Sequence, residues 1–110
     1  MRFIITCDAS DTGMRAVLSQ KIDVIERPIA FFSRKFCGAE KRYHINEKDG
    51  LAIIRSLQKF RHHILGYPVK VRSDNSTALA IFRNCSGEGR LGKYVVVAQE
   101  YQCTYLYSRI

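Results

Sequence analysis

The sequence predicts an α/β fold in which helices pack on a mixed sheet of five strands. Two observations support this prediction: apolar or alternating segments of strand length recur along the chain, and segments with helical apolar spacing separate the later ones. The predicted order is three strands, a helix, a strand, two helices and a last strand. This order gives an antiparallel opening meander, and helical crossovers make the later strands parallel to the first.

The first third of the chain is predicted to form the meander. Residues 3–7 are almost wholly apolar and rich in β-branched side chains, which indicates a strand buried on both faces. Asp8 closes this strand, and Ser10 to Gly13 supplies a turn. Two further strands are expected, at residues 16–20 and, after a proline, at residues 29–33.

A long helix is predicted next. Asn46 is a favourable N-cap, and Glu47 in the first turn suits the positive end of the helix dipole. Gly66 is a natural residue to end the helix. Apolar residues recur between these ends at spacings of four, three and four, which predicts one face packed on the sheet: Ile53, Leu57, Phe60 and Ile64.

The last part of the chain is predicted to contain a strand, two helices and a final strand. Residues 69–73 alternate apolar and polar side chains and lead into Asp74. A short helix follows. The segment 94–97 includes three adjacent valines, which favour a strand, but the apolar spacing over residues 91–101 fits a helix, and we expect the helix. Residues 103–107 would form the last strand.

Length and composition limit the class of protein. The chain has 110 residues, which fits a single domain over residues 1–110 with a buried core. Its hydrophobic fraction of 46% and charged fraction of 25% are typical of globular proteins, unlike disordered or membrane proteins. No apolar run approaches the ~20 residues of a membrane span, and no signal peptide is evident. We expect an intracellular protein without a membrane partner, in the cytoplasm rather than the nucleus.

Charge and cysteine content suggest the kind of partner and the compartment. The formal net charge is +8, which favours a polyanionic partner, although many basic domains bind none. Basic residues around 34–35, 41–42 and 59–61 would either line a phosphate track or form a solvated face. The four cysteines form no Cys-x-x-Cys pair, which indicates free thiols in a reducing compartment.

Three carboxylates stand where predicted elements begin or end. Asp8 ends the first strand, Asp74 ends the fourth, and Glu47 opens the long helix. If the two strands are neighbours and the helix crosses them, these side chains converge, and a cluster of like charges is tolerated mainly when a cation neutralises it. Mg²⁺ prefers such hard oxygen ligands, and Mn²⁺ is an alternative. Each acid also has a simpler interpretation, as a turn residue, a helix-dipole partner or a cap.

At these residues the sequence resembles a known family. The matching segments cover nearly the whole chain in the same order: residues 8–13, 16–20, 27–35, 47–48, 51–53, 59–62, 65–66, 71–74 and 89–101. They resemble the RNase H domain of gypsy-class LTR retrotransposon reverse transcriptase polyproteins. The resemblance implies an RNase H-like fold.

The resemblance also implies a function and a site. It implies a metal-dependent endonuclease that hydrolyses the RNA strand of an RNA/DNA hybrid by two-metal catalysis, with Asp8, Glu47 and Asp74 as catalytic and metal-binding residues. A parent or companion reverse transcriptase polypeptide is a second expected partner. The family's fourth carboxylate lies on a helix after the last strand, beyond Ile110, so that we expect this C-terminal helix to be missing. A catalytically inactive remnant, acting as a nucleic-acid-binding or structural module, therefore remains the alternative.

A competing motif lies in the first turn. Asp11-Thr12-Gly13 also matches the signature of retroviral aspartic proteases. A protease loop should follow an apolar strand directly, whereas Asp8 and Ser10 come before Asp11 here. A glycine-containing hairpin turn is the better interpretation.

Overall fold

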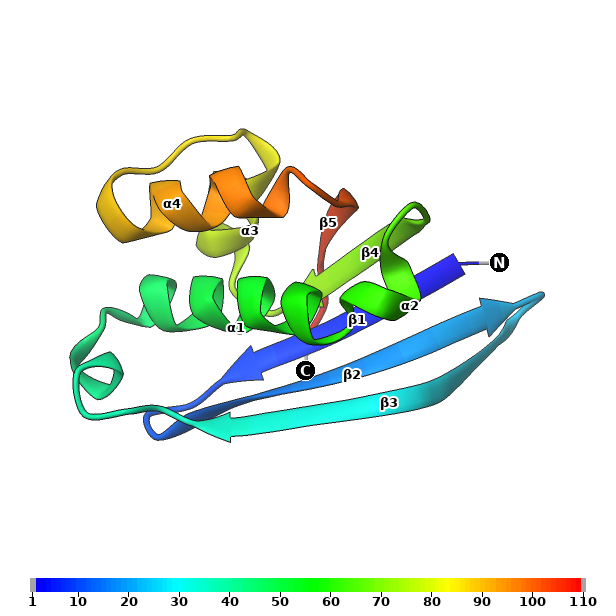
Figure 1. The fold of residues 1–110 in the computed structure, drawn as a ribbon, viewed down its shortest axis with the longest axis horizontal. Coiled ribbons are helices and arrows are strands. Elements are labelled where there is room, and N and C mark those ends of the chain that lie inside the picture. Colours follow the sequence, from blue (N-terminus) through cyan, green and yellow to red (C-terminus); the bar gives the residue numbers. More distant parts are fainter. Residues whose placement is uncertain (1, 110) are drawn as a thin grey trace.

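The computed structural model describes residues 2–109, and its centre is a five-stranded mixed sheet (Figure 1). The strands lie in the order β3-β2-β1-β4-β5. This sheet confirms the predicted fold class, because an antiparallel meander is combined with parallel later strands. The strands are β1 (Arg2–Ala9), β2 (Gly13–Ile22), β3 (Ile25–Lys35), β4 (Pro68–Ser73) and β5 (Gln102–Tyr107).

The central strand β1 determines where the candidate site forms. It pairs antiparallel with β2 and parallel with β4. The β1–β4 register places Thr6 opposite Arg72. Asp8 and Asp74 each follow that pair by two residues. Because neighbouring strands are only about 4.8 Å apart, the two aspartates reach the same edge of the sheet side by side.

The helices lie on one side of the sheet (Figure 1). None of those in residues 2–109 is long and apolar enough to cross a membrane. The segment with three adjacent valines is helical, as predicted: Val95 and Ala98 of α4 are buried, whereas Val96 is 66% exposed. The helices are η1 (Glu40–Arg42), α1 (Ile45–Lys59), α2 (Arg61–Ile64), α3 (Ser76–Arg83) and α4 (Gly89–Ala98).

The core lies between the sheet and α1. Alternate residues of β1 face the helix, and Phe3, Ile5 and Cys7 belong to the core. Leu57 of α1 is fully buried against them, as its position in the apolar stripe predicts. The opposite face of the sheet is more open, and Phe31 on β3 is 72% exposed.

The ends of the long helix differ from the prediction. The N-cap is His44 rather than Asn46, because the His44 Nδ1 accepts a hydrogen bond from the Asn46 backbone N–H at 3.2 Å. The Glu47 carboxylate accepts in return from the His44 backbone N–H at 3.1 Å, which completes a capping box. The helix also breaks at Phe60, between α1 and α2.

Two glycines have structural roles around α1. Gly66 has a φ of +87°, a conformation that glycine adopts readily, and it follows the end of α2 as the sequence predicts. Gly50 lies where α1 meets α4, and a Cβ there would be 2.6 Å from the Leu91 Cδ2. The missing side chain at residue 50 therefore lets the two helices pack closely.

Candidate metal centre at the edge of the sheet

Three aspartates lie near the ends of β1 and β4 and the start of α1. We call Asp8, Asp49 and Asp74 the aspartate cluster. Asp8 is the next-to-last residue of β1, Asp74 directly follows β4, and Asp49 lies near the start of α1. Two neighbouring parallel strands and one crossing helix therefore place at one edge of the sheet three aspartates that are far apart in the sequence.

Asp49 is the most deeply buried member of the aspartate cluster, with 5% of its surface exposed. Its Oδ2 accepts a hydrogen bond from the Asn75 Nδ2 at 2.8 Å. Burial raises the pKa of Asp49, and the charges of Asp74 and Asp8 raise it further, while the Asn75 amide lowers it. The charged form of Asp49 is therefore costly in this position, and a nearby cation would lower that cost.

The buried thiol of Cys7 lies within range of the charges of all three aspartates. Burial raises the pKa of Cys7, and the charges of all three members of the aspartate cluster raise it further. The thiol is directed to the Arg72 backbone oxygen, at 3.7 Å. Cys7 is thus a neutral residue of the core beneath the aspartate cluster, and a metal-binding thiolate is disfavoured there.

Glu47 lies elsewhere, although the sequence suggested it as the helix ligand. Its Oε1 completes the capping box with His44, and its Oε2 accepts from the Arg90 Nη1 at 2.8 Å. The Arg90 guanidinium also stacks over the Tyr43 ring, 3.8 Å from its centroid. Glu47 is therefore occupied by the helix start and by α4, and the structure brings Asp49 to Asp8 and Asp74 in its place.

The helical period explains why Asp49, and not Glu47, lies on the side of α1 that faces the sheet. Asp49 precedes Ile53 by four residues, which extends the apolar stripe that packs on the sheet back into the first turn. Glu47 is two residues away, on nearly the opposite side of the helix. The stripe that predicted the packing of the helix was therefore the signal that would have identified Asp49.

Asp8 already has a positively charged neighbour. The Arg15 Nη2 lies 3.3 Å from the Asp8 Oδ2, and the Arg15 side chain is 76% exposed. Such an exposed pair contributes about 0–1 kcal/mol. Arg15 therefore partly neutralises Asp8 but is free to move away.

The aspartate cluster fits a divalent cation by its chemistry, although it is not arranged around a common point. Within residues 2–109, no three acidic, histidine or cysteine side chains lie close enough to hold one ion. Carboxylate oxygens are the ligands that Mg²⁺ and Mn²⁺ prefer, and Mg²⁺ commonly keeps several waters while using one or two carboxylates. The three carboxylates are therefore chemically suitable ligands for the Mg²⁺ or Mn²⁺ that the resemblance implies.

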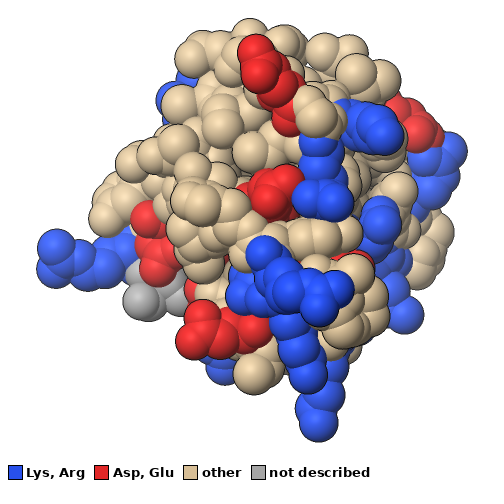
Figure 2. Space-filling model, turned by 90° about the vertical axis from the view of Figure 1, so that its left-hand side faces the viewer, with Lys and Arg blue, Asp and Glu red and all other residues tan. Residues whose placement is uncertain are grey.

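Basic side chains gather on part of this face of the molecule, with acidic side chains among them (Figure 2). Arg34 is not available to a phosphate, because its guanidinium makes two bonds to Glu40, at 2.9 and 3.1 Å. The Arg34 hydrogen bond lowers the pKa of Glu40 to about 2. A cavity of about 490 Å³ lies beside Asp8, and both Arg15 and Lys35 line it. The phosphate track predicted from the sequence thus stays a prediction. Arg34 would not contribute to it while it is bonded to Glu40.

Comparison with known proteins identifies the family. Residues 1–101 match the model of the RNase H-like domain found in reverse transcriptase. The chain belongs to this family. Asp11 and Thr12 accordingly lie in the hairpin turn between β1 and β2, Gly13 begins β2, and the aspartic protease interpretation does not apply.

The relatives of this RNase H-like domain are LTR retrotransposon polyproteins. The chain is 35% identical over 107 residues to the Pol polyprotein from transposon opus of Drosophila melanogaster, covering 96% of this chain and 11% of that protein. It is 31% identical over 105 residues to the transposon Tf2-3 polyprotein of Schizosaccharomyces pombe, covering 91% of this chain and 8% of that protein. The RNase H-like domain thus spans a small part of the polyproteins that it matches.

Solved structures show the same fold at low sequence identity. LC11-RNase H1 in complex with an RNA/DNA hybrid superposes with a TM-score of 0.74 at 15% identity, covering 96% of this chain and 84% of that chain. RNase H1 from Halobacterium salinarum has a TM-score of 0.71 at 12% identity, with 98% and 86% covered. These matches confirm the predicted RNase H-like fold.

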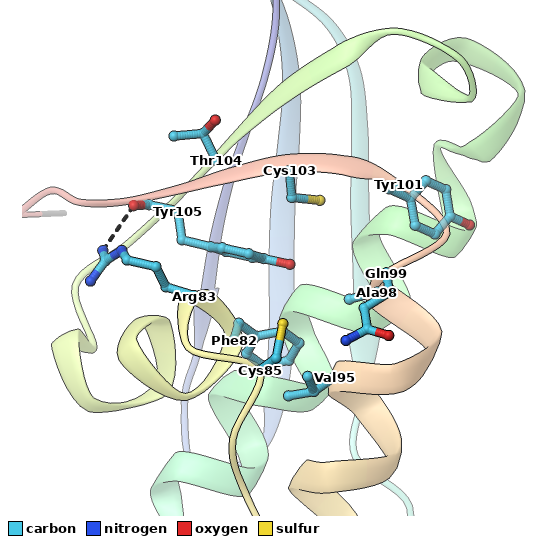
Figure 3. Close-up of a pocket in the computed structure, with 10 residues that line it drawn as sticks. All are labelled: Phe82, Arg83, Cys85, Val95, Ala98, Gln99, Tyr101, Cys103, Thr104 and Tyr105. Carbon is cyan, nitrogen blue, oxygen red and sulfur yellow. Dashed lines mark hydrogen bonds between the residues drawn. The ribbon is translucent and has the colours of Figure 1, made fainter.

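A second cavity of this RNase H-like domain lies between α3, α4 and β5, with a volume of about 390 Å³ (Figure 3). Cys85, Cys103 and Tyr105 line it. Burial raises the pKa of Cys103 and of Tyr105, so that both are neutral at physiological pH. No member of the aspartate cluster lines this cavity. Its chemistry does not resemble that of a nuclease site.

Proposed function

We propose that this RNase H-like domain hydrolyses the RNA strand of an RNA/DNA hybrid, with Mg²⁺ or Mn²⁺ bound by Asp8, Asp49 and Asp74. The observation that supports the proposal most is the position of Asp49, buried at the edge where the other two aspartates end their strands. A buried carboxylate beside two like charges is costly, and such sites are candidates for function. In this proposal Asp49 replaces Glu47 as the helix ligand.

The residues of the site have distinct roles in this proposal. Asp8 and Asp74 bind cations from adjacent strand ends, and Asp49 binds from the helix. Bound divalent cations would supply activation of water and stabilisation of the leaving oxygen. Glu47 maintains the start of α1 through its capping box with His44. Cys7 forms an apolar floor that limits the approach of water from the core side.

The proposed substrate is a hybrid duplex, and the proposed partner is a reverse transcriptase polypeptide. The net charge of +8 favours a polyanion, and Arg15 and Lys35 line the cavity to which Asp8 also contributes. Preference for RNA would come from contacts to 2′-hydroxyl groups in a wide, shallow minor groove. The polyprotein relatives support the proposal that this domain works as part of a larger reverse transcriptase polypeptide. We expect hybrid cleavage to take place inside the cell.

A second candidate is a non-catalytic module that binds hybrids or supports another polypeptide. Two observations favour it: within the described residues 2–109 the aspartates do not form a complete ion-binding group, and Arg15 already pairs with Asp8. Such a module would keep the fold and the basic surface. It would bind a hybrid without cutting it.

Cleavage of a labelled RNA/DNA hybrid in Mg²⁺ or Mn²⁺ distinguishes the two candidates. The nuclease proposal expects RNA fragments from the purified chain, and it expects Asp49→Asn to abolish them. Glu47→Gln is the matched control, since it makes the same amide substitution two residues away. Binding without cleavage by the unaltered chain would support the non-catalytic module.

A further inference from the structure

The side chain of Asn75 connects three elements at the edge of the sheet. Asn75 follows Asp74 and is the N-cap of α3, where its Oδ1 accepts from the Ala78 backbone N–H at 3.0 Å. Its Nδ2 donates to the Asp49 Oδ2 at 2.8 Å and to the Asn46 Oδ1 at 2.9 Å. Both hydrogens of the amide and its oxygen therefore have partners.

The position of this amide is itself fixed. The Asn75 backbone N–H donates to the Ser73 Oγ at 3.2 Å, which ties the residue to the end of β4. The helix cap through Oδ1 fixes the side chain to the first turn of α3. The donor that reaches Asp49 thus comes from the segment that also carries Asp74, so that the two carboxylates are linked through one residue.

The helix cap does not account for the two bonds made by Nδ2. Capping requires only an acceptor, and serine is as good an N-cap as asparagine. The two Nδ2 bonds reach across to α1 instead, to Asn46 and Asp49. A buried carboxylate with like charges around it would otherwise turn towards solvent, and a fixed donor prevents this.

We propose that Asn75 is a positioning residue that holds the Asp49 carboxylate towards Asp8 and Asp74, ready for a divalent cation. This inference rests on the proposed function, because it assigns Asn75 a role in the same site. Hydrogen-bonding partners that orient metal ligands commonly alter metal affinity when they are changed. Asn75 itself does not contact the cation in this proposal.

Mn²⁺ binding to the full chain, followed by electron paramagnetic resonance, tests the proposal. Asn75→Ser keeps the cap acceptor and removes the donor to Asp49. We expect Mn²⁺ affinity to fall by about 10-fold. The melting temperature should fall by only a few degrees, because the helix cap remains while two hydrogen bonds are lost. The control is Asn84→Ser at the other end of α3, where the residue is exposed. Unchanged Mn²⁺ affinity in Asn75→Ser would overturn the proposal.

A second measurement separates this proposal from the metal site itself. Nuclear magnetic resonance couplings of the metal-free chain report whether the Asp49 side chain keeps one rotamer. We expect one rotamer in the unaltered chain and averaging in Asn75→Ser, and one rotamer in both would overturn the positioning role. If the unaltered chain binds no Mn²⁺ but shows this difference, the proposed function fails and the positioning role stands.

A third variant guards against an unfolded Asn75→Ser protein. Asn46→Ala removes the other acceptor of the Asn75 amide at the half-buried start of α1. It should weaken Mn²⁺ binding in the same direction by a smaller factor, because Asn75 then has more freedom. Tighter or unchanged binding in Asn46→Ala would contradict the proposed linkage.

Discussion

The two sides of the first turns of α1 carry acidic residues in opposite environments. Glu47 faces α4, completes a capping box and pairs with Arg90. Asp49 faces the sheet, is buried, and has a pKa raised by its burial and by the charges of Asp74 and Asp8. The capping box and Arg90 explain why Glu47 stands at its position. The buried charge of Asp49 is costly in the absence of a cation. This difference is why Asp49, and not Glu47, is the helix ligand in the proposed metal site.

The largest expected difference between the two sides is in hybrid cleavage. Asp49→Asn should reduce the cleavage rate by more than about 100-fold. Even changing a residue that only hydrogen-bonds to a metal ligand lowers metal affinity or activity by about 10- to 100-fold. Glu47→Gln should stay within about 3-fold of the unaltered chain, since glutamine keeps the acceptor of the capping box. Rates on a labelled hybrid at saturating Mg²⁺ measure both. Loss of cleavage in Glu47→Gln with activity retained in Asp49→Asn would reverse the assignment.

Thermal stability without metal should change in opposite directions on the two sides. The folded-state pKa of Asp49 is raised, so that its charged form destabilises the fold at neutral pH, and Asp49→Asn should raise the melting temperature by a few degrees. Glu47→Ala should lower stability by about 1 kcal/mol, because the capping box and the Arg90 pair are lost.

Calorimetry in chelator over a pH series measures this contrast. The gain from Asp49→Asn should be largest at neutral pH and should disappear in acid, where the native aspartate is protonated and neutral. A gain that persists unchanged in acid would mean that charge burial at residue 49 is not its cause. A lower melting temperature at neutral pH would contradict the predicted cost of the Asp49 charge.

Glu40 should respond to pH in the opposite sense to Asp49. Its pKa is lowered from 4.5 to about 2 by the Arg34 hydrogen bond, so that its stabilising contribution is complete above pH 4.5 and is lost as the pH falls towards 2. Glu40→Gln should therefore cost about 1 kcal/mol at neutral pH and little at pH 2. Urea unfolding at both pH values tests this. An equal cost at both would show that the ion pair does not contribute.

The smallest effect is expected at Arg15. Removing this cation from Asp8 by Arg15→Ala should tighten Mn²⁺ binding by about 2- to 3-fold at low salt, because the exposed pair is weak and easily screened. Titration at low and high ionic strength provides the check. Weaker binding after this substitution would indicate that Arg15 orients Asp8 and does not compete with the cation.

The sequence predicted the architecture well, together with the positions of two of the three aspartates at the edge of the sheet. Apolar alternation and turn residues predicted the strands, and the sheet places Asp8 and Asp74 side by side as their strand ends implied. The start of α1 could not be predicted as easily, because Asn46 is a good cap by type, whereas His44 takes that position through a reciprocal bond with Glu47. That bond is local, but histidine is not among the residue types that favour an N-cap, so residue type did not indicate it.

The sequence suggested Glu47 as the helix ligand, whereas Asp49 is the acid that faces the sheet, and the reason also lies at the start of α1. Glutamate in a first turn is explained by the helix dipole, which made Glu47 conspicuous in the sequence. Which acid faces the sheet depends on the phase of the helix, and the apolar stripe through Ile53 fixes that phase. The role of Asn75 depends on the distance between α1 and the end of β4, which only the folded chain reveals.

Mn²⁺ binding to Asp49→Asn and Glu47→Gln, measured side by side on the metal-free chain, tests the central claim most directly. If Asp8, Asp49 and Asp74 bind the cation, Asp49→Asn loses most of the affinity and Glu47→Gln keeps it. Equal affinity in both variants, or loss only in Glu47→Gln, would contradict the assignment of the metal centre to the aspartate cluster.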